Sequence, residues 1–321
     1  MRIIRFFGLA VGAVALLAAA FGFTSRFLPV TNHVVLVGAA FAPYLMACGV
    51  VAIIAFGIRR RWLLTSVAAA LVIAGVAVEV PLFISTAPQS DTVRLRVLTA
   101  NLYLGQGHPG VVVATAEQSA DIVALQELTP GMRRSLAIAG LDQAFPYQVL
   151  DPRPEASGTG LWSRYPVSEQ AIHPGYVNGL ISARIHVPDV TFEPTVLVAH
   201  MAGPWPQPIA HWGDDMRRAV QSVHEAASAG GQGCVLVAGD FNATYDMAPF
   251  RAIAADGFRD GAEQSGSGLI PTYPANLQVP PLLAIDHVMT NRCTATSVRS
   301  VVIPGSDHRG LLSTVEVPRR G

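Results

Sequence analysis

The sequence predicts an α/β domain preceded by three membrane-spanning helices, and three observations lead to this fold class. Charged residues make up only 14% of the 321 residues. They are unevenly spread, because residues 1–90 hold six arginines and one acid, whereas residues 91–321 hold sixteen arginines and twenty-one acids. In that second part, short apolar strands alternate with helical stretches, as in proteins whose helices pack on sheets. We therefore expect an apolar anchor in residues 1–85, a linker in 86–92 and a mildly acidic domain in 93–321.

The anchor is predicted from three apolar runs, in residues 6–23, 34–58 and 62–84. Each is close to the roughly 20 residues that a helix needs to cross a hydrocarbon core about 30 Å thick. The first run also fits a secretory signal, because arginines precede it and small residues follow near its end. The third run contains an acid, Glu79, which in an apolar run suggests function, but near the outer end of a helix its carboxylate would reach interfacial water.

The arginines predict on which side of the membrane the domain lies. Arg2 and Arg5 precede the first run, and residues 59–61 are three arginines between the second and third runs. Because arginine-rich loops stay in the cytoplasm, the chain should leave the third helix on the outer face, whether or not the first run is cleaved. We expect a multi-pass protein of the cell membrane whose domain is extracytoplasmic and close to the lipid bilayer.

The domain is expected to be rich in short strands. Residues 93–102 alternate polar and apolar before becoming continuously apolar, which is typical of a strand that enters a core. Turns rich in Pro, Gly and Asn separate the elements that follow. The predicted strands are residues 93–102, 121–126, 147–150, 160–163, 181–187, 195–200, 234–239, 283–289, 297–302 and 311–317, and the predicted helices are residues 109–120 and 209–229.

Polar side chains stand where several of these strands begin or end. Carboxylates, carboxamides and imidazoles that meet at one sheet edge make a site for a hard divalent cation with acid and base groups. Taken singly, each has an ordinary explanation: a strand-end turn, the start of a helix, or an Asx turn. The set is Asn101, Glu127, His200, Asp240, Asn242, Asp286, Asp307 and His308.

This ordered set resembles the endonuclease/exonuclease/phosphatase superfamily, whose fold is shared by DNase I-like nucleases and neutral sphingomyelinases. The motifs that carry the resemblance are LQE at residues 125–127, GDFN at 239–242 and SDH at 306–308. The resemblance implies a DNase I-like, four-layered α/β-β/α sandwich. It also implies a metal-dependent phosphoric ester or pyrophosphate hydrolase that uses Mg²⁺, with Mn²⁺ as the alternative.

The resemblance also implies a role for each residue of the set. Glu127 would be the principal Mg²⁺ ligand, Asn101 a contact to metal or phosphate, and Asp307 would lie near the metal. The remaining five would be catalytic. Asp240 would position the attacking water and Asn242 would hold it. His308, oriented by Asp286, would donate to the phosphate or act as acid/base, and His200 matches the histidine of the nuclease and sphingomyelinase branches.

The substrate is left open by these motifs. Three anchor helices with an outward domain resemble bacterial VanJ-type membrane proteins, associated with resistance to teicoplanin-like glycopeptides. That resemblance implies a phosphate-bearing lipid or cell-wall precursor, such as a polyprenyl pyrophosphate. Independently, the loop at residues 201–212 carries Trp205 and Trp212, which would either contact lipid or the apolar part of a substrate, or cap the edge of the sandwich. A sphingomyelinase-like phospholipid diesterase is the next alternative. Nucleic acid is disfavoured by a net charge of −5 over residues 91–321, although a local basic groove would permit it.

Two further alternatives concern catalysis and the cysteines. A non-catalytic binding protein on the same scaffold would be expected to have lost a metal ligand or the Asp-His pair, and every expected position is filled. Cys234 and Cys293 would lie at strand ends away from the site, and an extracytoplasmic domain would be in an oxidising compartment. They would bond if their Cα atoms came within about 7 Å, but two buried free thiols are the expected outcome.

Overall fold

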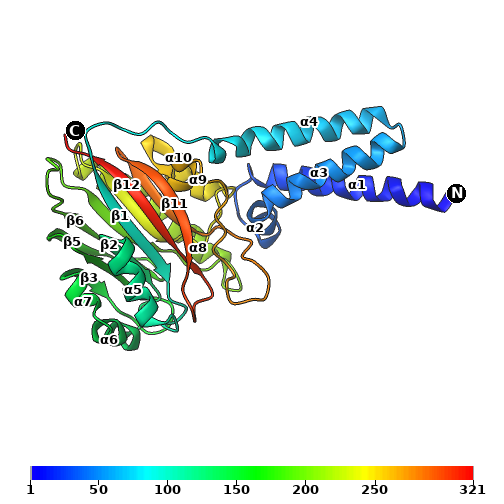
Figure 1. Cartoon of the computed structure of the whole chain (residues 1–321). Helices are drawn as coiled ribbons and strands as arrows, with labels where there is room; N and C mark the ends of the chain where they lie inside the picture. Colours follow the sequence, from blue (N-terminus) through cyan, green and yellow to red (C-terminus); the bar gives the residue numbers. More distant parts are fainter. Residues whose placement is uncertain (1, 321) are drawn as a thin grey trace. The chain divides into compact units, whose positions relative to one another are not determined.

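The computed structural model describes residues 2–320, with side chains from Phe7 onward. Its chain forms two compact units. One contains the described residues up to Pro81 together with a later segment, Thr244–Arg251. The other contains Leu82–Ala243 and the described residues from Ala252 onward. Figure 1 shows both units, and each is described separately below.

The first unit is built from apolar helices. Of these, α1, α3 and α4 pack along one another (Figure 1). Small residues permit this approach, because Ala15, Ala52 and Ala68 are buried around Phe56 in one cluster. The helices are α1 (Arg2–Ser25), α2 (His33–Ala40), α3 (Ala42–Ile58) and α4 (Trp62–Glu79), with a 3₁₀ turn η1 (Val80–Phe83) after α4.

Two stretches are long and apolar enough to span a membrane as single helices, Phe7–Ser25 and Trp62–Phe83. The apolar run at residues 34–58, expected as one helix, is instead a pair, α2 and α3, with a bend of 71° between them. Pro43 lies in the first turn of α3. Because proline has no N–H group and clashes with the preceding turn, it begins a helix more readily than it continues one. The described residues thus contain two candidate spans, or three if the bent pair is counted as one.

The second unit contains two sheets of six strands each. The first sheet has the order β11-β12-β1-β2-β4-β3 and the second β5-β6-β7-β8-β10-β9. The strands of the first are β1 (Thr92–Asn101), β2 (Ile122–Gln126), β3 (Tyr147–Asp151), β4 (Thr159–Ser163), β11 (Thr294–Val302) and β12 (Arg309–Pro318). Those of the second are β5 (Val167–His173), β6 (Gly179–Ile185), β7 (Thr195–His200), β8 (Val235–Asp240), β9 (Arg259–Asp260) and β10 (Asp286–Asn291).

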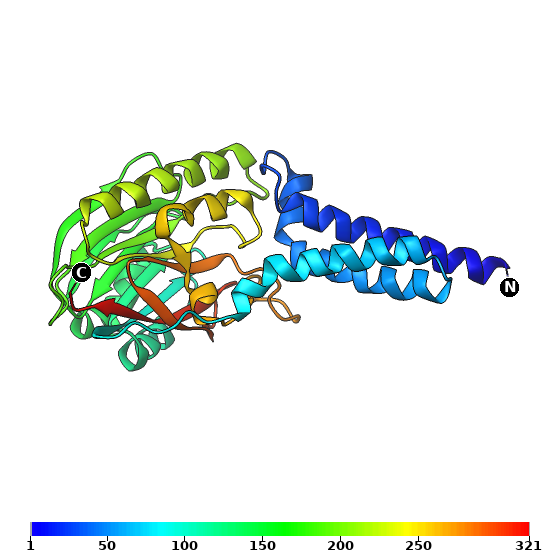
Figure 2. The same cartoon turned by 90° about the horizontal axis from the view of Figure 1, so that it is seen from above.

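Helices cover the outer faces of the two sheets, as Figure 2 shows. Alternation along β1 directs Val97 into the core between the sheets and Leu98 toward the helices outside. On the far side, α8 buries Trp212 and Met216. The helices of this unit are α5 (Pro109–Ser119), α6 (Pro130–Ile138), α7 (Leu141–Ala144), α8 (Ile209–Ala229) and α10 (Gly261–Ser265), with a 3₁₀ turn η2 (Ala255–Gly257). A further helix, α9 (Ala248–Ile253), begins in the first unit and ends in the second. The expected α/β sandwich is therefore observed in the second unit.

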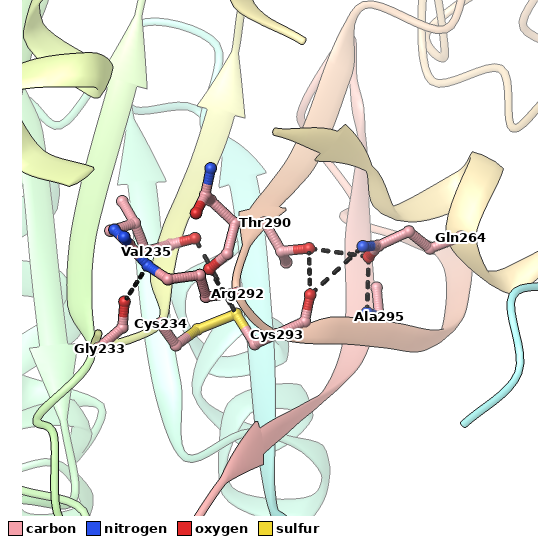
Figure 3. Close-up of a disulfide and its surroundings, with 9 residues drawn as sticks. Gly233, Cys234, Val235, Gln264, Thr290, Arg292, Cys293 and Ala295 are labelled. Atoms are coloured by element: carbon pink, nitrogen blue, oxygen red, sulfur yellow. Dashed lines mark hydrogen bonds between the residues drawn. A yellow bond between two sulfur atoms is a disulfide. The ribbon is translucent and has the colours of Figure 1, made fainter. Parts of the chain in front are cut away.

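The expectation of two free thiols is wrong, because Cys234 and Cys293 form a disulfide (Figure 3). Their Cα atoms are 5.3 Å apart. The reason is the strand order, since β8 and β10 are antiparallel neighbours with Val235 opposite Asn291. The cysteines lie just beyond this pair, at the strand ends opposite to those that carry Asp240 and Asp286. The remaining cysteine, Cys48 in α3, is free.

Candidate active site

Four of the predicted polar residues lie at the ends of strands, whose register brings them together, and the other four lie within two residues of a strand. β7 and β8 are parallel with His200 opposite Asp240. β10 is antiparallel to β8, and its first residue, Asp286, also lies opposite Asp240. In the other sheet, β1 and β2 are parallel, so that Asn101 pairs with Gln126, the residue before Glu127. Side chains from both sheets therefore reach one edge of the sandwich.

Asn101 connects the carboxylates of the two sheets. Its buried Nδ2 donates to Glu127 Oε1 at 3.1 Å and to Asp240 Oδ2 at 3.0 Å. The orientation of the carboxamide is fixed because its oxygen accepts from Tyr103 N at 2.9 Å. One short side chain thus holds two acids close together, where both can face the same cation or phosphate.

Glu127 leaves the end of β2 in the left-handed backbone region, with φ of 55°. Its carboxylate accepts from Asn101 and from Leu104 N. Burial raises the pKa of this carboxyl, and the charge of Asp307 raises it further, although the two hydrogen bonds oppose the shift. A cation beside Glu127 would stabilise the charged carboxylate and so oppose this rise in pKa.

The GDFN motif forms a tight turn after β8. Asn242 N donates to Asp240 Oδ1 at 2.8 Å, and Asn242 Nδ2 donates to Met201 O at 3.1 Å. Gly239 cannot be replaced without moving the backbone, because a Cβ there would lie 1.9 Å from Ala199 O. Asn242 has φ of 48°, a conformation that asparagine tolerates better than most residues. Gly239, Asp240 and Asn242 thus each have a structural reason.

His308 and Asp286 form a buried pair. His308 Nδ1 lies 2.8 Å from Asp286 Oδ2, and its Nε2 lies 3.8 Å from Asp240 Oδ2. Burial lowers the pKa of the imidazole, but the charges of Asp286 and Asp240 outweigh burial and raise the pKa to about 10. His308 is therefore an imidazolium at neutral pH, with a proton on Nε2 available for donation toward the site.

His200 is a different kind of histidine. Its Nε2 lies 3.2 Å from Asn178 Nδ2 and 3.7 Å from Asp240 Oδ2. Burial and the nearby charge of His308 lower its pKa to about 3, so the ring is neutral and Nε2 can accept from the Asn178 amide. A neutral imidazole between two polar neighbours orients groups rather than transferring protons at neutral pH.

Two residues of the site were missed by sequence reasoning. Asn178, which also donates to Met201 O at 3.0 Å, precedes a glycine and has the pattern of an ordinary turn. Tyr273 lies in a loop rich in proline, and its ring centroid is 4.9 Å from that of His308. No local pattern marks either residue as part of a site. The Asn-Gly and Tyr-Pro pairs mark them only as turn positions.

The site fits a divalent cation by the chemistry of its donors. Ligand atoms of Asp240, Asp286 and His308 lie within 4.8 Å of one another. Within residues 2–320, Asp286 Oδ1 and Asp307 Oδ1 are buried carboxylate oxygens that have no hydrogen-bond partner. Burial also raises the pKa of Asp307 and raises that of Asp240 to about 7. A bound cation would give the unpartnered oxygens a ligand to contact and would stabilise the charged forms of these buried carboxylates.

The two candidate sets of metal ligands differ. The sequence points to Asn101, Glu127 and Asp307, whereas spacing alone groups Asp240, Asp286 and His308. His308 is a poor ligand here, because an imidazolium has no lone pair free and its Nδ1 already binds Asp286. We therefore expect the carboxylates of Glu127 and Asp307 to hold the cation, with Asn101 beside them. His308 would then act as a proton donor.

Comparison with known proteins identifies a family whose match covers most of the chain. The Endonuclease/Exonuclease/phosphatase family matches residues 65–308. No curated protein matches the sequence. Solved structures match well, but at identities below 20% they bear on the fold alone.

Three of these structures illustrate the likeness. Humanized D. rerio TDP2 has a TM-score of 0.57 and 19% identity, covering 69% of this chain and 98% of that one. An endonuclease/exonuclease/phosphatase from Beutenbergia cavernae has a TM-score of 0.56 and 18% identity, covering 70% and 72%. D. rerio TDP2 complexed with single strand DNA product has a TM-score of 0.54 and 18% identity, covering 69% and 98%.

Proposed function

The chain belongs to the endonuclease/exonuclease/phosphatase family, and we propose that it is a membrane-anchored, Mg²⁺-dependent phosphoesterase that acts on a phosphate-bearing lipid. One observation carries the chemistry. The hydrogen bonds from Glu127 through Asn101 to Asp240 lie beside the His308–Asp286 pair, so acids for a cation and a charged proton donor share one site.

The roles of the residues follow from their geometry. His308 would donate its Nε2 proton to a phosphoryl or leaving-group oxygen, and Asp286 would hold the ring through Nδ1. Asp240, with a pKa of about 7, suits a group that takes a proton from water near neutral pH. Asn242, fixed by Asp240, would orient that water.

The metal would be held by Glu127 and Asp307, with Asn101 beside them. When bound, Mg²⁺ supplies positive charge against the phosphoryl oxygens, which is the main requirement of phosphoryl transfer. Mn²⁺ prefers the same oxygen ligands and is the alternative.

For the membrane, we propose three spans over residues 6–23, 34–58 and 62–84, an anchor in 1–85, a linker in 86–92 and an extracytoplasmic catalytic domain in 93–321. The arginines at residues 59–61 support a cytoplasmic turn between the second and third spans. The Cys234–Cys293 bond supports an outward domain, because disulfides persist in oxidising compartments.

Exposed apolar side chains on the loops around the site support a lipid substrate. Trp205, five residues after His200, is 66% exposed, and Leu277 and Val279 are 57% and 54% exposed. The last two belong to residues 264–285, a stretch without any charged residue that runs from α10 past Tyr273 to Asp286. Such loops would contact the bilayer or the apolar tail of a lipid while the phosphate enters the site.

Among phosphate-bearing lipids, the VanJ-type resemblance favours a polyprenyl pyrophosphate of the cell wall, and with it a link to glycopeptide resistance. A phospholipid diesterase is the second candidate, because the same residues serve a phosphodiester.

The test is product release by the detergent-solubilised full chain. The substrates would be a polyprenyl pyrophosphate, sphingomyelin, a phosphoinositide and single-stranded DNA, each with Mg²⁺, with EDTA, and with the His308→Ala variant. We expect metal-dependent turnover of one lipid that the variant loses. Turnover of DNA alone would replace the lipid with nucleic acid. Turnover of no substrate would reject these lipids, and a Mg²⁺ titration would then decide between another substrate and a non-catalytic binding protein.

A further inference from the structure

The segment that follows the GDFN motif belongs with the anchor helices. Asn242 and Ala243 are part of the catalytic unit, whereas Thr244–Arg251 packs in one compact unit with the described residues up to Pro81. The chain therefore passes from a catalytic turn into the anchor unit within two residues, and it returns to the catalytic unit at Ala252.

A buried arginine holds this segment. Arg26, the first residue after α1, is 4% exposed, and Asp246 is 1% exposed. Arg26 Nη1 forms ion pairs with Asp246 and with Glu79 of α4, the latter at 3.3 Å. One guanidinium thus joins the ends of two anchor helices to the segment after the catalytic turn.

Further contacts fix the same segment from its other end. Arg251 donates to the backbone oxygen of Arg26, and it donates to Tyr245 O at 3.1 Å. The Arg26 guanidinium also lies over the Tyr245 ring, 5.3 Å from its centroid. The segment is therefore held by charges and a ring contact rather than by apolar packing alone.

Charges buried in this way depend on one another. An ion withdrawn from water is tolerated only beside a partner, and removal of one partner leaves the other uncompensated. Without Arg26, Asp246 would lose the cation of its ion pair, and Glu79 would keep only its weaker interaction with the charge of Arg251. The segment would then relax toward water, and Asn242, four residues before Asp246, would lose its fixed position.

We propose that Arg26 is a positioning residue for the catalytic turn, so that phosphoesterase activity depends on the anchor through the Arg26–Asp246 pair. This inference rests on the proposed function. Arg26 need not contact substrate, because it acts through residues 244–246 on Asn242. An ion cluster that served only to hold the fold together would lower stability without a selective effect on turnover.

The first experiment measures kcat and KM of the solubilised full chain. The substrate is bis(p-nitrophenyl) phosphate, a soluble phosphodiester whose hydrolysis does not depend on access to lipid. For Arg26→Gln and Asp246→Asn we expect kcat to fall by about 10-fold to 100-fold, since misplacement by about 1 Å costs on the order of 100-fold. KM should stay within about twofold, and Arg26→Lys should recover most of the loss.

Two controls make the result specific. Arg61→Gln removes an exposed arginine of the same unit and should leave kcat unchanged. The double variant Arg26→Gln/Asp246→Asn should be no slower than either single variant, because the two residues act as one pair. Full kcat in both single variants would overturn the proposal, as would additive losses in the double variant.

A second measurement does not require turnover. Hydrogen exchange in the Arg26→Gln variant should accelerate by about tenfold or more at the amides of residues 242–247, with the amides of β8 unchanged. Unchanged exchange at these amides, or equal acceleration throughout the domain, would overturn the positioning role. If the wild-type chain hydrolyses none of the substrates, the proposed function fails while this measurement still decides whether Arg26 positions the turn.

Discussion

At the scale of single residues, one carboxamide organises the site. Asn101 places its Nδ2 between Glu127 and Asp240, which come from different sheets, and its oxygen is held by the backbone of Tyr103. An aspartate at this position would add a third buried charge, and an alanine would leave two acids without their shared donor. The residue therefore sets both the spacing and the charge of the acids.

Replacement of Asn101 by Ala should lower kcat by about 100-fold, because a preorganised polar group of the site is lost. The thermal midpoint should fall only modestly, since β1 keeps its backbone pairing with β2 and β12. Gln143→Ala, an exposed substitution on α7, is the matched control. An Asn101→Ala variant with near wild-type kcat would show that the acids do not need this bridge.

The sequence predicts this group of residues well but not its neighbours. Asp240 and Asp286 lie opposite each other in the register of β8 and β10, and His308, just before β12, bonds to Asp286. Asn178 reaches His200 from the start of β6, and Tyr273 reaches His308 from a loop. Both contacts join segments far apart in the chain, so no local spacing could have signalled them.

At the scale of secondary-structure elements, β8 and β10 carry the chemistry and are tied at their opposite ends. They deliver Asp240 and Asp286 to the site, and the Cys234–Cys293 bond closes their far ends. The bond joins residues that are 59 apart in sequence. A loop of that length is worth about 4 kcal/mol in the chain-entropy account of disulfide stabilisation.

Changing both cysteines to serine should therefore lower the free energy of unfolding by about 2–4 kcal/mol. Chemical denaturation of the solubilised protein, with and without reductant, measures the difference. Reductant should destabilise the wild type and leave the double variant unaffected, and Cys48→Ser should behave as the wild type. Alkylation of both cysteines without reductant would contradict the bond.

Alternation along β10 predicts a pH effect on stability. Asp286 faces the site, and His287 faces the other way, where its Nδ1 binds Asp260 and its Nε2 lies 2.8 Å from Ala243 O. Both partners accept, so both ring nitrogens must carry protons. Burial lowers the pKa of His287, but Asp260 and Ala243, with the charge of Asp286, raise it above its usual value.

Because this pKa is raised in the folded state, the stabilisation is complete below about pH 6.5 and is lost as the pH rises through the folded-state pKa. The free energy of unfolding should fall between pH 6 and pH 9 more steeply in the wild type than in His287→Gln. Denaturant titrations across that range measure both slopes. Equal slopes would mean that His287 is neutral in the folded protein.

Element boundaries show where sequence patterns fail. Most predicted strands are present, but β5 (Val167–His173) was not predicted, since this edge strand is mostly polar and exposed. The predicted strand at residues 283–289 starts at Asp286 instead. Pro43 marks the break between α2 and α3. The residues on both sides of the break are apolar, so hydropathy shows one long run and does not reveal the change in helix direction.

At the scale of the whole molecule, ion pairs between residues distant in sequence hold parts of the chain together, and composition cannot reveal them. The family match begins at residue 65, within α4, so the matched region includes most of the last candidate span. Arg26 and Asp246 are distant in sequence, and each alone has the pattern of an ordinary charge in a loop. Only the folded chain shows that they are buried together.

The side of the membrane on which the domain lies can be tested on the same scale. Ile138, at the end of α6, is 87% exposed, and Arg60 lies in the turn between α3 and α4. In a Cys48→Ser background, the native cysteines that remain are bonded to each other, so a cysteine introduced at either position is the one reactive thiol.

A membrane-impermeant maleimide applied to intact cells should label Ile138→Cys and should not label Arg60→Cys until the membrane is opened. This follows because arginine-rich turns remain in the cytoplasm, which places the end of α4 outside. The reverse pattern would put the catalytic unit in the cytoplasm, where a disulfide does not persist, and the substrate would have to be sought on the inner leaflet. Labelling of both positions in intact cells would mean that α4, which lies between them in the chain, does not cross the bilayer.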